Sequence, residues 1–172
     1  TISFTLGFMS ACSQDTKYSN PDQPKRHANN AKNGTYARFN KEYDPTWMKN
    51  KNVLVTGSNR GIGLALTREL VGAGALVYAT CRKPSKELES LKPKMIISDV
   101  DVTSEQKCKI MASKIPVGLD VVINNAGYFA KDPETIDKLV FDEEIKMIDI
   151  CALGPLRVTS ALFNAKKINS NG

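Results

Sequence analysis

Thr-Gly-Ser-Asn-Arg-Gly-Ile-Gly, residues 56–63, stands between two different kinds of sequence. The apolar run Val53-Leu54-Val55 comes directly before it, and residues 64–70 follow with a helical pattern. A short run of apolar, mostly β-branched residues predicts a buried strand, and apolar residues at helical spacing predict a helix. A glycine-rich turn that joins such a strand to such a helix is typical of a dinucleotide-binding site.

Each glycine of this turn has its own predicted role. Gly57 allows the chain to turn tightly, Gly61 lets the backbone approach a pyrophosphate, and Gly63 lets the helix pack closely on the strand. The N–H groups at the start of the helix are free to bind phosphate. We therefore expect the pyrophosphate of a dinucleotide to bind at this turn.

The glycine spacing, with three residues between the first two glycines, resembles the short-chain dehydrogenase/reductase family. Residues 124–127 read Asn-Asn-Ala-Gly after the apolar run 121–123, and resemble the motif at the end of the family's fourth strand. Asp101-Val102 stands where the family has an Asp that contacts the adenine ring. The resemblance covers about Lys51 to Asn164. It implies that the following residues bind the cofactor: Gly57, Ser58, Arg60, Ile62, Gly63, Arg82, Asp101, Val102, Asn124, Ala126 and Gly127.

The fold class follows from alternating patterns. We expect strands at 52–56, 75–80, 94–98 and 119–124, and helices at 61–73, 85–91, 103–114 and 142–164. Alternation of this kind predicts an α/β fold, a doubly wound parallel sheet with helices on both faces, as in the Rossmann fold. The sheet is expected to be incomplete, because the family has a fifth strand beside 119–124. Without it, the apolar edge of that strand would be bare.

The family's catalytic residues have no counterpart here. The resemblance implies a Ser after the fifth strand and then a Tyr and a Lys spaced as Tyr-x-x-x-Lys. No Tyr of this sequence is followed by Lys four places later. We therefore assign no catalytic residue, and expect that the sequence stops before the catalytic half of a longer parent. Without the Tyr acid and the Lys that lowers its pKa, hydride transfer loses its main acid–base assistance.

Cys151 stands where the family has an Asn that shapes a helix and holds a water in the proton relay. A thiol is a weak donor and a weak acceptor, so it would support such a relay poorly. The simpler interpretation, which we prefer, is that Cys151 is a small packed residue.

The end of the second strand favours NADP over NAD as cofactor. NAD enzymes place an acidic residue there for the ribose 2′-hydroxyl. This chain has Cys81, Arg82 and Lys83 instead, and Arg60 adds a further cation in the glycine loop. Cations without a carboxylate suit a 2′-phosphate. The alternative is that Arg82 and Lys83 form an ordinary solvated turn.

Residues 1–50 are expected to be an extended tail ahead of the domain at 51–172. From Ser13 to Asn50 the segment is polar and has no sustained period of 2 or 3.6. Its aromatic residues and Met48 would anchor it either to a protein partner or to its own domain: Tyr36, Phe39, Tyr43 and Trp47. The apolar start, residues 1–11, is too short to span a bilayer. Interpreted as a targeting remnant, it does not distinguish between cytoplasm, plastid and mitochondrion as the compartment of the protein.

Composition excludes several classes of protein. The net charge of +6 comes without a dense basic cluster interleaved with aromatics, so we expect no nucleic-acid partner. The four cysteines have no metal-ligand spacing and are expected to be reduced thiols. His27, the only histidine, lies among polar residues and is expected to be solvated.

Two functions from different classes remain. In the first, the chain is the NADP-binding part of an oxidoreductase that reduces a carbonyl or oxidises an alcohol by hydride transfer. In the second, it is a non-catalytic accessory subunit of a larger assembly, on an organelle membrane for example, that keeps a nucleotide-binding fold. That assembly would contact the tail and the edge of the strand at 119–124.

Overall fold

The computed structural model describes residues 28–29, 32, 44–130, 135 and 137–169. The chain divides into two units, Thr1–Tyr43 and Asp44–Gly172, and the second carries the site. Residues 1–11, interpreted above as a targeting remnant, and the predicted anchors Tyr36, Phe39 and Tyr43 lie outside the described residues.

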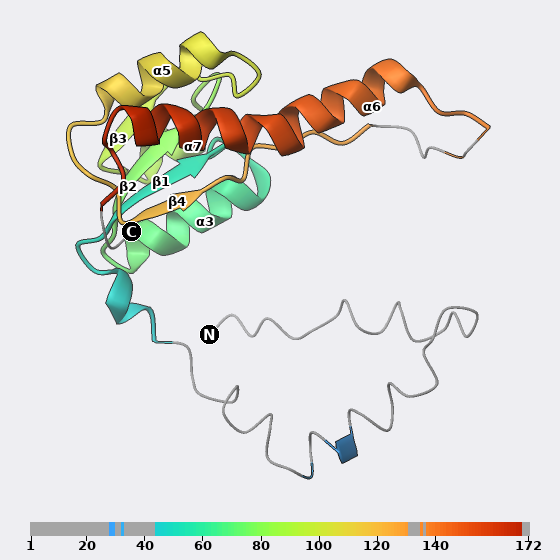
Figure 1. The fold of residues 1–172 in the computed structure, drawn as a ribbon. Coiled ribbons are helices and arrows are strands. Elements are labelled where there is room, and N and C mark those ends of the chain that lie inside the picture. Colours follow the sequence, from blue (N-terminus) through green and yellow to red (C-terminus); the bar gives the residue numbers. More distant parts are fainter. Residues whose placement is uncertain (1–27, 30–31, 33–43, 131–134, 136, 170–172) are drawn as a thin grey trace. The chain divides into compact units, whose positions relative to one another are not determined.

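Four parallel strands form the centre of the second unit (Figure 1). They are β1 (Asn52–Thr56), β2 (Leu76–Thr80), β3 (Met95–Ile97) and β4 (Val121–Ile123), in the spatial order β3-β2-β1-β4. The register places Val53 beside Val77 of β2 and Val121 of β4. This order and the helical crossovers confirm the doubly wound Rossmann sheet that the sequence predicts.

Helices connect the strands and cover both faces of the sheet. Along the chain they are α3 (Gly61–Gly72), α4 (Lys86–Ser90), α5 (Glu105–Lys114), α6 (Phe141–Ile148) and α7 (Gly154–Asn164), with a 3-10 turn η2 (Pro45–Met48) before β1. Serine side chains begin two of them, because Ser85 and Ser104 accept hydrogen bonds from the third residue of α4 and α5. Such capping satisfies an N–H group that the helix itself leaves free.

The alternation of side chains along the strands makes two apolar layers. Leu54 and Tyr78 face the layer that α5 and α7 cover, while Val53, Val55 and Val77 face the layer beneath α3 and α4. In Figure 1, α5 and α7 lie on one side of the sheet and α3 on the other. Both layers hold the strand ends in place, and the loops that leave those ends form the site.

The helix predicted at 142–164 consists of three segments. Between α6 and α7 lies a π-helical turn, η3 (Asp149–Leu153), which adds a residue to the helical repeat. In Figure 1 the three segments form one rod, and α6 extends beyond the sheet. Single π turns inside helices frequently mark functional sites.

Two expectations about the margins of the domain can be compared with the structure. Met48 is buried in the layer under α3, so this part of the predicted tail packs on its own domain, while Trp47 stays half exposed. On the outer side of β4, the described residues contribute a single parallel bridge, between Leu119 and Ile168. The edge along Val121–Ile123 is otherwise open in this part of the chain. No helix among the described residues has the length and apolar character needed to cross a bilayer.

Candidate functional site

A pocket of about 510 Å³ lies where the chain leaves the carboxyl ends of the parallel strands. Its lining comes from the loops after β1, β2, β3 and β4 and from the helix that follows β4. The connection after β1 leads to one side of the sheet and β4 lies on the other, which makes this edge a topological switch point. Ligands of open α/β sheets bind in the crevice at such points.

The glycine loop brings main chain rather than side chains to the pocket. Gly57 and Gly61 have φ of +67° and +55°, a region that favours glycine. A Cβ on Gly61 would meet nothing within 4 Å, so the space over this residue is open to a ligand. A Cβ on Gly63 would collide with the carbonyl oxygen of Gly57 and the side-chain amide of Asn125. The predicted roles of Gly61 and Gly63 therefore fit the geometry.

The start of α3 is suited to an anion. Arg60 precedes the helix in extended conformation, and its side chain makes no capping hydrogen bond. The first N–H groups of a helix have no partner within the helix and carry the positive end of its dipole. The first three residues of α3, Gly61, Ile62 and Gly63, all line the pocket. The loop thus offers a cradle of main-chain donors that fits a pyrophosphate.

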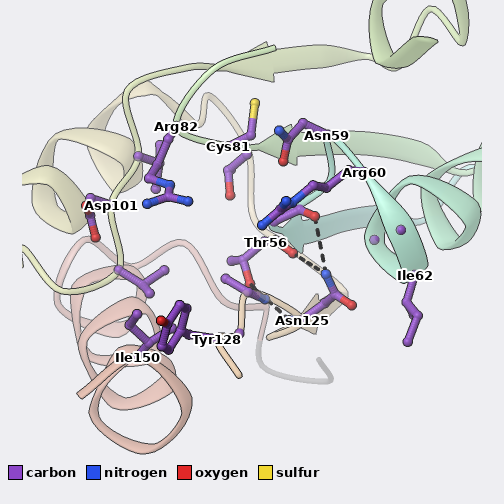
Figure 2. A pocket seen from close by; sticks show the side chains of 18 of the residues that line it. Thr56, Asn59, Arg60, Ile62, Cys81, Arg82, Asp101, Asn125, Tyr128 and Ile150 are labelled. Atoms are coloured by element: carbon purple, nitrogen blue, oxygen red, sulfur yellow. Dashed lines mark hydrogen bonds between the residues drawn. The ribbon is translucent and has the colours of Figure 1, made fainter. Parts of the chain in front are cut away.

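Thr56 joins the glycine loop to the loop after β4. Its hydroxyl oxygen accepts hydrogen bonds from the main-chain amides of Asn125 and Ala126, both at 3.0 Å. In return the side-chain amide of Asn125 donates to the carbonyl oxygens of Thr56 at 2.9 Å and Gly57 at 3.3 Å. Figure 2 shows these bonds at the base of the pocket. The two loops are therefore held as one surface.

The side of the pocket formed by β2 and β3 carries opposite charges. The Arg82 guanidinium points into the pocket, with Asp101 on the same side and Ile62 across from them (Figure 2). Burial acts to raise the pKa of Asp101, but hydrogen bonds from Thr103 and the charge of Arg82 outweigh it and hold the pKa below its usual value. Cys81 is buried, which raises the pKa of its thiol and keeps it uncharged.

The net charge of the pocket wall is positive. Among the described residues that line it, the cations are Arg60, Arg82 and Lys146, and the one carboxylate is Asp101. A wall of this kind favours a ligand with several negative charges. In the part of the chain that the structure describes, no cluster of His, Cys, Asp or Glu could hold a metal ion.

Tyr128 fastens the loop after β4 to α6. Its hydroxyl donates to Glu143, and the ammonium of Lys146 lies 3.9 Å from the centroid of its ring. The hydrogen bond from Tyr128 holds the pKa of Glu143 below its usual value, and the contact with Tyr128 raises the pKa of Lys146. Tyr128, Lys146 and Ile150 all line the pocket, so this cluster forms part of its wall.

Cys151 differs from the packed residue expected from the sequence. It is exposed, and its sulfur lies 3.4 Å from both the main-chain nitrogen and the oxygen of Tyr128. The prediction of simple packing is therefore wrong, because the π turn aims this side chain at the loop after β4 instead of the core. Cys81, Cys108 and Cys151 are all free thiols.

Comparison with known proteins shows which family the chain belongs to. The sequence pattern of the family described as short chain dehydrogenase matches residues 51–172. The chain belongs to the short-chain dehydrogenase family. Members of this family share the Rossmann sheet and the dinucleotide crevice, and the position of the pocket at the switch point agrees with both.

Several members of the short-chain dehydrogenase family resemble this chain. Nodulation protein G of Azospirillum brasilense is 34% identical over 113 residues, which is 57% of this chain and 44% of the relative. The NADP-dependent 3-hydroxy acid dehydrogenase of Escherichia coli is 31% identical over 118 residues, 64% of this chain and 47% of the relative. A crystal structure of an NADH-dependent reductase complexed with NAD superimposes with a TM-score of 0.58 at 25% identity, covering 71% of this chain and 54% of that one.

The chain spans about half the length of the curated relatives it matches. Catalytic residues that the family carries in the other half of its sequence are therefore not assigned to this chain. The similarity concerns the dinucleotide-binding half of the fold.

Nine of the eleven cofactor-binding residues predicted from the sequence line the pocket: Gly57, Arg60, Ile62, Gly63, Arg82, Asp101, Val102, Ala126 and Gly127. Ser58 and Asn124 do not. Ser58 is fully buried, and its hydroxyl donates to the carbonyl oxygen of Thr80, so it supports the loop from beneath. Asn124 is exposed outside the lining, and its neighbour Asn125 takes the inward position.

Sequence reasoning missed several lining residues. Thr56 and Asn125 stand within or beside the recognised motifs, so the motifs themselves signalled them. Tyr128, Lys146 and Ile150 had no such signal, because a loop and a helix bring them to the pocket from separate parts of the chain.

Proposed function

We propose that this chain forms the NADP-binding part of a short-chain oxidoreductase whose whole protein reduces a carbonyl or oxidises an alcohol by hydride transfer. The observation that carries the cofactor choice is the end of β2. Arg82 points into the pocket there, Cys81 beside it is uncharged, and no carboxylate follows β2 directly. A ribose 2′-phosphate needs a cation at this place, whereas a 2′-hydroxyl is normally held by a carboxylate.

The similar proteins do not decide between the two cofactors, so the choice is argued from the charges at the end of β2. One of them is named as NADP-dependent, and one similar structure is of an NADH-dependent reductase. Arg60 reinforces Arg82 from the glycine loop. Guanidinium groups bind phosphate in paired, charge-assisted hydrogen bonds, so these two residues favour the phosphorylated cofactor.

Different groups of pocket residues would bind different parts of the cofactor. Gly57, Gly61 and Gly63 would hold the pyrophosphate, and Arg60 and Arg82 the 2′-phosphate. Asp101 and Val102 would line the adenine, while Ala126 and Gly127 would contact the ribose on the other side. The cofactor, when bound, would supply the hydride for carbonyl reduction in its reduced form, or accept it for alcohol oxidation in its oxidised form. Ser58 is proposed to support the glycine loop and not to touch the cofactor.

Titration calorimetry with NADPH and NADH tests the cofactor choice. We expect NADPH to bind at least tenfold more tightly, because a charge-assisted contact contributes about 1.5–3 kcal/mol. Arg82→Ala should remove most of this preference, and Cys81→Asp should reverse it. Lys83→Ala is the matched control, because Lys83 is the neighbouring cation outside the pocket lining. Equal affinity for the two dinucleotides would refute the assignment.

Assays of the natural full-length protein separate the oxidoreductase from the accessory subunit. NADPH oxidation with aldehydes or ketones supports the first. Tight NADPH binding without turnover across such substrates, in a protein lacking a Tyr-x-x-x-Lys pair, supports the second. No contact among the described residues favours the accessory role.

We also propose that a further strand covers the outer edge of β4, supplied by residues after Ile168 or by another chain. The Leu119–Ile168 bridge starts such a pairing: Leu119 donates to Lys167 and Asn169 donates to Leu119. Hydrogen exchange of the β4 amides tests this. Slow exchange on both sides of the strand indicates cover, whereas fast exchange of the amides that face away from β1 indicates a bare edge.

A further inference from the structure

Arg157 of α7 joins two segments that are far apart in the sequence. One nitrogen of its guanidinium donates to the carbonyl oxygens of Val102 and Asp149, both at 3.3 Å. The other nitrogen bonds to the Asp149 carboxylate at 2.6 Å. The side chains of Arg157 and Asp149 are only 25% and 32% exposed, so this ion pair is partly shielded from water. Charge-assisted hydrogen bonds of this kind are stronger than neutral ones.

Both joined segments are walls of the dinucleotide pocket. Val102 lines it from the loop after β3, and Ile150, the residue next to Asp149, lines it from the π turn. Gly154 allows the close approach of these walls, because a Cβ there would lie 2.9 Å from a methyl group of Val102. The guanidinium of Arg157 thus holds the two walls together from a position outside the pocket lining.

The tied side of the pocket is the side that would take the adenine. The start of α3 marks the position of a pyrophosphate, and the sheet continues from there through β2 to β3. A dinucleotide laid along this edge therefore extends its adenosine half past Arg82 toward Asp101 and Val102. The nicotinamide half extends the opposite way.

We infer that Arg157 is a positioning residue that sets the width of the adenine side of the pocket by holding Val102 against the π turn. The inference rests on the proposed dinucleotide-binding function. Arg157 itself does not line the pocket, so its loss acts on the ligand only through Val102 and Ile150.

The experiment compares two fragments of the cofactor. Adenosine 2′,5′-bisphosphate probes the tied side, and nicotinamide mononucleotide probes the other, with binding to each followed by NMR titration. We expect Arg157→Met to raise the Kd of the adenine fragment roughly tenfold, the loss that one charge-assisted contact implies. The Kd of the nicotinamide fragment should stay within about twofold. Arg157→Lys should recover only part of the loss, since an ammonium cannot bridge both partners as a fork.

Two controls separate positioning from general loss of stability. Leu162→Val removes buried volume from the same helix one turn away and should lower the urea midpoint without changing the preference between fragments. Arg68→Met removes an exposed cation on α3 and is the control for the loss of one positive charge. If adenine-fragment binding in Arg157→Met stays within twofold of wild type, or if both fragments weaken together as stability falls, the inference is wrong.

A double-mutant cycle adds a second readout. Asp149→Ala frees one arm of the guanidinium, and the double variant with Arg157→Met should bind the adenine fragment no more weakly than Arg157→Met alone. Additive losses would contradict a shared action. Failure of the wild type to bind either fragment would overturn the proposed function and this inference together, whereas normal wild-type binding with an unaffected Arg157→Met overturns the inference alone.

Discussion

Thr56 and Asn125 exchange hydrogen bonds across 69 positions of sequence. The main-chain amide of Asn125 donates to the Thr56 hydroxyl at 3.0 Å, and the Asn125 side chain donates to the Thr56 carbonyl oxygen at 2.9 Å. This pair fastens the glycine loop to the loop after β4 and so holds the two halves of the pocket floor together.

Thr56→Val should lower the free energy of unfolding by about 1–3 kcal/mol, because it leaves the partly buried amide of Ala126 without its acceptor and leaves the amide of Asn125 with only the carbonyl oxygen of Ile123. NADPH affinity should fall as well. Urea unfolding and calorimetry measure the two effects. Thr56→Ser keeps the hydroxyl and should cost only about 0.8 kcal/mol for the missing methyl group. A serine variant less stable than the valine variant would contradict this role.

Gly63→Ala should weaken NADPH binding more than tenfold and lower the melting temperature. The added methyl group would displace the Gly57 carbonyl, and overpacking of about 1–3 kcal/mol exceeds the gain of about 1 kcal/mol in helix propensity. Gly72→Ala is the control on the same helix, where a Cβ meets open space. It should raise the melting temperature and leave affinity unchanged; similar behaviour of the two variants would show that the contact at Gly63 is unimportant.

Stability should fall in acid partly through Asp120. The amide of Asn52 donates to one of its carboxylate oxygens and Asn169 to the other. The bond from Asn52 is the main reason why the pKa of Asp120 lies below its usual value. A carboxyl with a lowered folded-state pKa adds stability above its unfolded pKa of about 3.9, and this stability is lost as pH falls through the folded value.

Urea midpoints of wild type and Asp120→Asn, measured from pH 6 to about pH 2.5, check the role of Asp120. The wild type should be the more stable protein at pH 6, and the difference should shrink below about pH 4. Asp142→Asn, at an exposed carboxyl on α6, is the control. A difference that stays constant across this range would exclude titration of Asp120 as its cause.

Tyr128→Phe should raise the pKa of Glu143 toward its ordinary value. The variant removes the hydroxyl that donates to Glu143 but keeps the ring beneath Lys146. NMR titration of the Glu143 side-chain carboxyl measures the change. Lys146→Met is the companion variant, and it should shift the same pKa upward by a smaller amount, because Tyr128 is the larger cause of its lowering. An unchanged pKa in Tyr128→Phe would mean that the tyrosine does not hold α6 through Glu143.

Residues close together in sequence made the fold predictable. The glycine loop, the apolar strands and the alternation of strand and helix are local patterns, and each expected element between 52 and 114 appears within two residues of its predicted bounds. A buried parallel strand needs a continuous apolar run, and a tight turn at positive φ needs glycine. Nine of the eleven residues that the family resemblance implied as cofactor-binding line the pocket, because the motifs that carry the resemblance are also local in the sequence.

Tertiary structure alone decided how distant segments meet. The π turn at 149–153 cannot be recognised from a repeat in the sequence. It nevertheless turns Cys151 toward Tyr128 and aligns Arg157 with Val102. Whether Asn124 or Asn125 faces the pocket depends on the hydrogen bonds that Thr56 offers. The sequence by itself therefore determined the Rossmann fold and its glycine loop, because both rest on local propensity. Packing between distant elements decided the walls of the pocket, because those contacts exist only after the chain has folded.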